Sequence, residues 1–167
     1  LKTSLDENLN MIRDTICFLN SKNKKVIFDA EHFFDGYKSN KEYAMMTLKV
    51  AKESGANVVV LCDTNGGTLP NEIKEITNEA VNAFGNIIGI HCHNDIGMAV
   101  ANSIMAIDAG ATHIQGTFIG VGERCGNTNL STVIPTIVLK MDCNIKANTH
   151  LQQLTAKSRY IAEISNI

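Results

Sequence analysis

The sequence predicts a parallel α/β fold built from four consecutive strand–helix units. Short apolar, β-branched runs alternate with longer amphipathic segments along the 167 residues, a pattern typical of parallel sheets whose strands are covered on both faces. A glycine stands just before the second, third and fourth of these runs, at Gly55, Gly85 and Gly110. The left-handed residue that ends a helix is most often glycine, so each of these positions is expected to end a helix.

Four strands are expected, each in a short run rich in Val, Ile, Leu and Phe. They are Lys25–Ala30, Asn57–Asp63, Asn86–His93 and Thr112–Ile119. Strands that alternate with helices in this way form parallel sheets, either open and doubly wound or closed into a barrel. A complete barrel needs ~250 residues, so this chain has room for only part of one. The pattern by itself leaves both architectures open.

Helical periodicity marks the segments between and around these strands. Leu5–Phe18 precedes the first strand, and Leu151–Ile164 follows the fourth unit. In the second unit, Thr68 is a candidate helix N-cap and Pro70 a candidate first-turn proline. The apolar stripes are Ile73, Ile76, Ala80, Val81 and Phe84 in the second unit, Ile96, Val100, Ile104 and Ile107 in the third, and Leu130, Val133, Ile134, Ile137, Val138 and Met141 in the fourth.

The composition argues against several classes of protein. A net charge of −2 with 5% aromatic residues and no basic stripe argues against nucleic-acid binding. No apolar run approaches the ~18 residues that a membrane span needs, and no secretory signal opens the chain. Five widely spaced cysteines without a CxxC pair argue against a disulfide framework and favour a cytoplasmic location. Because the chain begins at Leu1 rather than Met, we expect it to be part of a longer protein.

Polar residues gather where each predicted strand ends. The four ends read DAEH (residues 29–32), CDTNGG (62–67), HCHND (91–95) and GVGERCGN (120–127). In parallel α/β proteins the carboxyl ends of the strands carry the functional site. Polar residues at all four ends therefore predict a site there.

His91 and His93 are the strongest candidates for metal ligands. Side chains two residues apart on a strand share one face, with Cα atoms about 6.5 Å apart. Two imidazoles at that spacing can bind one cation at about 2.1 Å. Cys92 would point to the opposite face as a small buried side chain. One histidine in the core and one at the rim is the competing interpretation, but a pair that ends an apolar strand favours ligation.

Other strand-end residues allow more than one role. Asn127 suits a helix N-cap and could also give an amide oxygen to a hard cation, and the residues alone favour the cap. Glu31 could be a general base, a substrate hydrogen-bonding group or a solvated carboxylate. Thr64 could bind a substrate carboxylate or satisfy its own turn. Arg124 is expected to pair with its neighbour Glu123 on the loop surface.

HCHND and GERCGN, with the strand ends in this order, resemble the TIM-barrel, metal-dependent acyl-CoA enzymes. This family includes the isopropylmalate, homocitrate and citramalate synthases and the hydroxymethylglutaryl-CoA lyases. The resemblance runs from about Val26 to Lys140. It implies that the four units are strands five to eight, the C-terminal half of a (β/α)₈ TIM barrel over residues 1–147. A terminal helix in residues 148–167 would lead to a further region.

The resemblance also implies roles for individual residues. It assigns His91, His93 and Asn127 as ligands of a divalent cation, whether Mn²⁺, Mg²⁺, Co²⁺ or Zn²⁺. Glu31 and Thr64 are then expected near a 2-oxo acid as catalytic groups. The candidate substrate-binding residues are Asp29, Thr64 and Arg124. The family's first strand supplies an Arg–Asp pair that these 167 residues lack, so the chain alone is expected to be inactive.

The form of two segments narrows the expected reaction. FDAEHFFDGYK (residues 28–38) and LCDTNGGTLP (61–70) are similar to those of citramalate synthases, and GERCGN differs from the corresponding loop of the lyases. This predicts condensation of acetyl-CoA with pyruvate, with isopropylmalate or homocitrate synthesis as the alternative. A non-catalytic metal-binding half barrel is the alternative from another class. Because a half barrel leaves strand edges and an inner face open, a homo-oligomer is expected.

Overall fold

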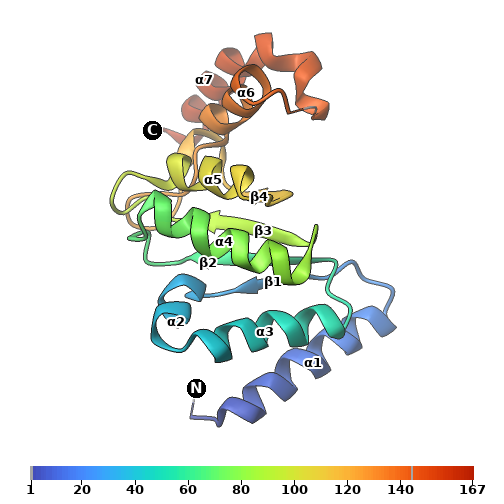
Figure 1. Cartoon of the computed structure of the whole chain (residues 1–167). Coiled ribbons are helices and arrows are strands. Elements are labelled where there is room, and N and C mark those ends of the chain that lie inside the picture. The colour runs from blue at the N-terminus through green and yellow to red at the C-terminus, as the bar shows by residue number, and fades with distance from the viewer. Residues whose placement is uncertain (1, 144) are drawn as a thin grey trace.

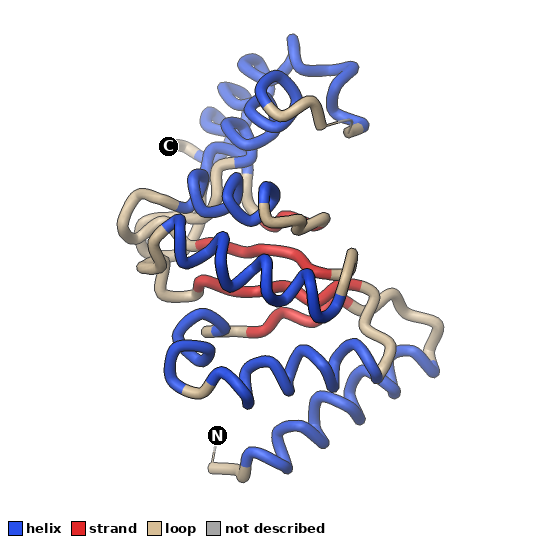
Figure 2. The backbone as a smooth tube through the Cα atoms, viewed as in Figure 1, coloured by secondary structure: helices blue, strands red, loops and turns tan. Residues whose placement is uncertain are grey.

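The computed structural model describes residues 2–143 and 145–167, which form one four-stranded parallel sheet. Its strands are β1 (Ile27–Ala30), β2 (Val58–Asp63), β3 (Ile88–Cys92) and β4 (His113–Gln115). They pair in the order β1-β2-β3-β4, each parallel to the next, and Figure 2 shows them side by side. A doubly wound sheet reverses its strand order part-way. The sequential order therefore excludes that alternative and confirms a segment of a barrel.

The helices follow one another along the molecule in chain order. In Figure 1 they run in succession from α1 (blue), near the N-terminus, to α6 and α7 (orange to red) at the other end. Consecutive helices are in contact, α3 with α4, α4 with α5, and α5 with α6, as expected when each right-handed crossover leaves its helix on the same face of the sheet. The bounds are α1 (Leu5–Ser21), α2 (Phe33–Ser39), α3 (Lys41–Glu53), α4 (Pro70–Phe84), α5 (Ala99–Asp108), η1 (Phe118–Gly120), α6 (Leu130–Lys140), η2 (Lys146–Gln153) and α7 (Leu154–Ser165).

The apolar core lies between the sheet and these helices. Leu61, Ile88 and Ile90 of the central strands are completely buried, together with Leu48 of α3 and Ile73 of α4. Both β2 and β3 are buried along most of their length, as their continuous apolar runs predict. The core therefore holds the helix layer against the two central strands.

The predicted helix ends are confirmed at the glycines. Gly55, Gly85 and Gly110 have φ of +95°, +79° and +102°, a region that favours glycine. Pro70 is the first residue of α4, as predicted. These local signals help to position the strands, because each glycine lies three residues before the start of one.

Thr68 was predicted as the cap of α4, and this is wrong. The N-cap is Leu69, whose backbone N–H donates to Glu72 Oε2 at 3.1 Å. The hydroxyl of Thr68 instead donates to Asp63 Oδ1 at 2.8 Å, where both side chains are buried. The buried carboxylate at the end of β2 needs a hydrogen-bond partner, and this requirement decides the role of Thr68.

The stripe predicted for the third helix is also wrong. Ile96 precedes α5, and the buried residues of α5 are Ala99, Asn102, Ser103 and Ala106. Asn102 Nδ2 donates to the Thr68 carbonyl at 2.8 Å, and this contact fixes the buried face. Small side chains allow α5 to approach the sheet closely, whereas periodicity selected its larger, half-buried residues. In α4, by contrast, the predicted Ile73, Ile76 and Ala80 are buried as expected.

The fourth strand is much shorter than the predicted Thr112–Ile119. β4 ends at Gln115 because the backbone near Thr128, after the loop, lies where the strand would continue. Thr117 N donates to the Thr128 carbonyl at 3.0 Å. A Cβ at Gly116 would lie 2.5 Å from that same oxygen. The loop backbone therefore replaces the end of the strand, and η1 follows.

The sheet face opposite the helices, called here the inner face, is curved. The register pairs Cys62 with His91 and His91 with Gln115. Gln115 Nε2 on β4 donates to Asp29 Oδ1 on β1 at 2.9 Å. In a flat sheet these two strands would lie about 14 Å apart, too far for the two side chains to meet. The sheet therefore bends toward its inner face, as barrel strands do.

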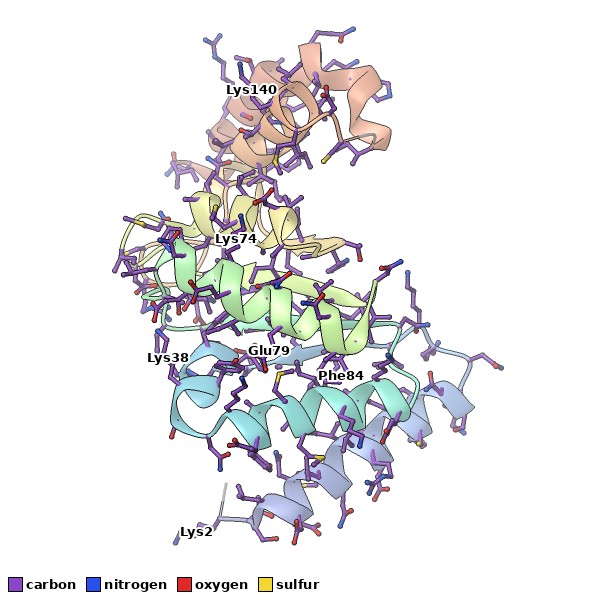
Figure 3. The ribbon with its side chains drawn as sticks, in the orientation of Figure 1. Lys2, Lys38, Lys74, Glu79, Phe84 and Lys140 are labelled. Carbon is purple, nitrogen blue, oxygen red and sulfur yellow. The ribbon has the colours of Figure 1, made fainter. Side chains whose placement is uncertain are left out.

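The outer surface ties the helices together with ion pairs. Lys41 Nζ lies 2.8 Å from Glu79 Oε2 and joins α3 to α4, and Lys74 Nζ lies 2.6 Å from Asp108 Oδ2 and joins α4 to α5. Lys38, Lys74 and Glu79 are labelled in Figure 3.

Within the part of the chain that the structure describes, no helix combines the length and the apolar character that a membrane span requires.

Candidate metal centre and active site

The strand ends bring the predicted site residues to one edge of the inner face. Parallel pairing places the carboxyl ends of β1 to β4 together, and the alternation of side chains along each strand selects the inner face. The residues that meet there are Asp29, Glu31, Thr64, His91, His93 and Gln115, with Arg124 and Asn127 from the loop after η1. The predicted convergence of the strand ends is thus present in the fold.

The two histidines lie on the same face, as their spacing predicts. Their ring centroids are 5.1 Å apart, with 46° between the ring planes. Cys92, between them, faces the helices and is 1% exposed. Burial raises the pKa of its thiol, which keeps the sulfur protonated and removes it from the donor set.

His91 has a partner that determines which ring nitrogen it offers. Its Nδ1 lies 2.8 Å from Gln115 Oε1. An amide oxygen only accepts, so Nδ1 of His91 carries the proton and Nε2 keeps its lone pair. This is the arrangement that a metal-binding imidazole needs.

His93 has a different neighbour. Nη2 of Arg124 lies 3.2 Å from His93 Nδ1, and a guanidinium only donates, so Nδ1 accepts. The pKa of His93 is lowered first by burial and then by the nearby His91 and Arg124. His93 is therefore held neutral, the form in which an imidazole can bind a metal.

Asn127 fits a metal ligand better than a helix cap. The N-cap of α6 is Asn129, whose Oδ1 accepts from Ser131 N at 2.9 Å. The side-chain oxygen of Asn127 is buried and has no hydrogen-bond partner among the described residues. A Cβ at Gly122 would lie 2.3 Å from Asn127 Nδ2, so the loop closes tightly over this side chain. A buried acceptor without a partner is costly unless something fills its lone pairs, and an amide oxygen suits a hard cation.

The candidate donor set is thus two imidazoles and one amide oxygen. Within the described residues, no group of three or more His, Cys, Asp or Glu is arranged to hold a metal ion, so Asn127 is needed to reach three donors. The free Nε2 of His91 and the unpartnered oxygen of Asn127 fit a divalent cation. His93 offers Nδ1, the atom that Arg124 now contacts.

Arg124 pairs mainly with Asp95, whereas Glu123 was expected to be its partner. Its Nε and Nη2 donate to the two Asp95 oxygens at 2.7 and 2.9 Å, and Nη2 also donates to the Thr64 carbonyl at 2.7 Å. The contact with Glu123 is 3.8 Å. This hydrogen-bonded pair lowers the pKa of Asp95 and raises that of Arg124. The planar guanidinium suits a two-point contact with a carboxylate better than the adjacent Glu123 allows.

Glu31 and Thr64 form a hydrogen-bonded pair beside the histidines. The Thr64 hydroxyl donates to Glu31 Oε2 at 2.7 Å and accepts from the backbone N–H of His32 at 2.8 Å. Cys62 lies on the same face and is buried, and its pKa is raised by burial and then by Glu31 and Asp29. The site is therefore rich in carboxylates, and its thiol is inert.

Two residues of this arrangement were missed by the sequence analysis, Gln115 and Asp95. Asp95 lies two residues after His93, but its partner Arg124 lies 29 residues further along the chain. Gln115 lies within a predicted strand, and only the register shows that it stands opposite His91. To find Gln115 from the sequence, the exact register between the third and fourth strands would have to be known.

Comparisons with known proteins identify relatives that match the whole chain. A family model described as HMGL-like matches residues 1–161. The chain is 52% identical to the (R)-citramalate synthase of Synechocystis sp., over 100% of this chain and 32% of that protein. It is 34% identical to the 2-isopropylmalate synthase of Blochmanniella pennsylvanica, over 100% of this chain and 33% of that protein. The chain therefore spans about a third of the length of the curated relatives that it matches.

A solved structure shows the same fold at low identity. The hydroxymethylglutaryl-CoA lyase of Pseudomonas aeruginosa superposes with a TM-score of 0.81 at 14% identity, over 100% of this chain and 58% of that one. The partial coverage of that chain agrees with a four-stranded segment of a barrel. Because the HMGL-like family model matches nearly the whole sequence, the chain belongs to the HMGL-like family.

Proposed function

We propose that the chain is part of a divalent-metal-dependent enzyme that condenses acetyl-CoA with pyruvate and water to give citramalate and CoA. The observation that carries this proposal is the buried amide oxygen of Asn127, which lies beside His93, two residues along from His91, and has no hydrogen-bond partner among the described residues. We propose these three residues as the ligands. The alternative is condensation of acetyl-CoA with the 2-oxo acid that isopropylmalate or homocitrate synthases use.

The comparisons support pyruvate over the larger acids. Identity is 52% to a citramalate synthase and 34% to a 2-isopropylmalate synthase over the same stretch of chain. Residues 28–38 and 61–70, which border the site, were the segments that favoured the same choice in the sequence. The partners would then be two small molecules, acetyl-CoA and a 2-oxo acid, and a homo-oligomer is part of the same proposal.

A bound divalent cation would polarise the keto carbonyl of the 2-oxo acid as a Lewis acid. Transfer of a proton from the acetyl methyl group to a general base gives an enolate that attacks this carbonyl. The former keto oxygen then takes up a proton, and water hydrolyses the thioester to release CoA. Glu31 is our candidate for orienting substrate or water, since its carboxylate is held by Thr64 at 2.7 Å. Thr64 can bind the acid by turning its hydroxyl proton from Glu31 to the substrate carboxylate.

Asp29 and Arg124 complete the proposed substrate contacts. The Nε and Nη2 atoms of Arg124 are engaged by Asp95 and Thr64. Its Nη1 has only the 3.8 Å contact with Glu123 among the interactions of the described residues. This nitrogen is the one available to a substrate carboxylate. Asp29 borders the same face and accepts from Gln115.

The test is thiol release from acetyl-CoA, measured with a chromogenic disulfide in the presence of Mn²⁺. Pyruvate, 2-oxoisovalerate and 2-oxoglutarate are compared, on the full-length protein that contains this chain and on the 167-residue chain alone. We expect pyruvate-dependent release by the full-length protein only. Release with another acid would refute the choice of pyruvate, and release with none would favour a lyase or a non-catalytic metal-binding module.

Two histidine variants make the assay specific for the proposed centre. His91→Ala should lower turnover by at least about a hundredfold, because a metal ligand stabilises developing charge by several kcal/mol. His113→Ala is the matched control, since His113 lies on the neighbouring strand two residues before Gln115. It should keep turnover within about threefold of the wild type. Equal losses in both variants, or an unfolded His91→Ala protein with unchanged metal affinity, would contradict the assignment.

A further inference from the structure

Gln115 connects three strands across the inner face. Its Oε1 lies 2.8 Å from His91 Nδ1 on β3, and its Nε2 lies 2.9 Å from Asp29 Oδ1 on β1. Its position opposite His91 follows from the register of β3 and β4. One side chain thus bridges a candidate metal ligand and a carboxylate that is 86 residues away in sequence.

The chemistry of the two neighbours determines how the amide is oriented. A carboxylate only accepts hydrogen bonds, so the NH₂ group of Gln115 must face Asp29. The amide oxygen then faces His91, and an oxygen acceptor requires the proton on His91 Nδ1. The orientation of the amide follows from Asp29 and does not depend on telling oxygen from nitrogen by position.

We propose that Gln115 is a positioning residue that holds His91 in the Nδ1-protonated tautomer, and that Asp29 sets the direction of its amide. His91 then presents Nε2 to a divalent cation. This inference rests on the proposed metal centre. It adds a residue that touches neither the substrate nor the cation, and it gives Asp29 a role in addition to the substrate contact proposed above.

His93 provides an internal comparison. Its Nδ1 faces Arg124, a donor, so neutral His93 carries its proton on Nε2. The two imidazoles of one motif are therefore set to opposite tautomers by different partners. A change at Gln115 should alter His91 and leave His93 as it is. A general disturbance of the site would alter both.

The experiment is ¹⁵N NMR, at mildly alkaline pH, of the full-length protein that contains this chain, labelled with ¹⁵N-histidine. Calorimetry measures its Mn²⁺ binding. Gln115→Met keeps the length of the side chain and removes both hydrogen-bonding groups. We expect His91 to move from Nδ1–H toward Nε2–H and His93 to stay unchanged. The Mn²⁺ affinity should fall about 10- to 100-fold, the range for partners that orient a metal-binding histidine.

Two further variants serve as rescue and control. Gln115→Glu still accepts from His91 Nδ1–H and should keep the tautomer. Gln152→Leu replaces an exposed glutamine of η2 and should change neither readout. If Gln115→Met does not reach the wild-type circular dichroism spectrum, Asp29→Ala tests the same idea, because it frees the amide to turn and should lower the Nδ1–H population of His91.

The inference is overturned if folded Gln115→Met keeps both the tautomer of His91 and an Mn²⁺ affinity within about twofold of the wild type. It is also overturned if Gln115→Glu loses the tautomer. Failure of the proposed reaction is a separate outcome. An intact His91 tautomer without pyruvate-dependent thiol release would refute the reaction and leave the role of Gln115 standing.

Discussion

At the scale of single residues, the site depends on which atom each side chain offers. Asp29 directs the amide of Gln115, and this amide directs the ring of His91. Asn127 offers a buried oxygen that has no other partner among the described residues. Unpartnered buried acceptors are rare in folded proteins and call for an explanation. A cation that binds this oxygen would provide one.

Asn127→Ala tests this explanation against an asparagine with a structural role. The Mn²⁺ affinity should fall at least about tenfold, because a ligand is removed. The melting temperature should change little, since among the described residues the amide oxygen has no hydrogen-bond partner and the amide nitrogen has only a long bond to the Val121 carbonyl at 3.5 Å. Calorimetry and thermal unfolding measure the two quantities.

Asn129→Ala is the matched control two residues along the chain. It removes the N-cap of α6, which should cost about 1 kcal/mol of stability and leave the Mn²⁺ affinity almost unchanged. The reverse pattern, with stability lost in Asn127→Ala and affinity lost in Asn129→Ala, would contradict the metal-ligand assignment.

At the scale of elements, ion pairs on the outer surface hold neighbouring helices in place. Glu79 of α4 accepts from Tyr37 of α2 at 2.6 Å and from Lys41 of α3 at 2.8 Å. The hydrogen bond from Lys41, followed by that from Tyr37, lowers the pKa of Glu79. This carboxylate ties α4 to both helices of the first unit, so α2 and α3 are held over β1 and β2.

The pH dependence of stability should reveal this tie. Folding lowers the pKa of Glu79. The Glu79 carboxylate therefore contributes its full stabilisation of the folded state above its unfolded pKa, and this stabilisation is lost as the pH falls through its folded-state pKa. Glu79→Gln should therefore melt below the wild type at pH 7, and the two melting temperatures should converge in acid. Thermal unfolding from pH 7 to pH 3 measures this difference.

Glu75→Gln is the control on the same helix, because Glu75 makes no ion pair among the described residues. Its melting temperature should follow the wild type across this pH range. A constant difference in melting temperature between Glu79→Gln and the wild type down to pH 3 would show that the carboxylate charge does not stabilise the contact of α4 with α2 and α3.

At the scale of the whole molecule, the curved sheet has an open inner face. Within the described part of the chain, β1 and β4 each pair on one side only. Ile27 on the inner face of β1 is 44% exposed. Open strand edges and exposed apolar side chains favour association with other protein chains.

We therefore predict that the 167-residue chain self-associates. Light scattering after size exclusion should give a mass above the 18.2 kDa of one chain, rising with concentration. Ile27→Lys places a charge on the inner face and should shift the distribution toward the monomer. Ile164→Lys, at a 64% exposed position of α7, should not. A concentration-independent monomer with cooperative unfolding would contradict this prediction.

Much of the fold could be predicted because its signals are local. The glycines at 55, 85 and 110 end their helices as predicted, and Ile73, Ile76 and Ala80 of α4 face the core. In α5 the prediction failed, because Asn102 and Ser103 form buried hydrogen bonds that hold the helix in a different rotation. Hydrophobic periodicity carries no information about such bonds.

The sequence by itself determined the chemical types at the site. His91 and His93 were identified because parallel strands bring their carboxyl ends together, and because alternation along a strand places residues two apart on one face. These rules act over a few residues, so they can be read without knowing how the strands pair. The site roles of Asn127, Glu31 and Thr64 came from the resemblance of the strand-end motifs to a known family.

Only the tertiary structure decided the partners of these residues. Asp29 meets Gln115 across the two central strands, Arg124 meets Asp95 rather than its neighbour Glu123, and Asn129 rather than Asn127 caps α6. Each choice depends on strand register, sheet curvature and the path of the loop after η1. These arise from packing between segments far apart in the chain, and hydrogen-bond partners and tautomers are set only after that packing is complete.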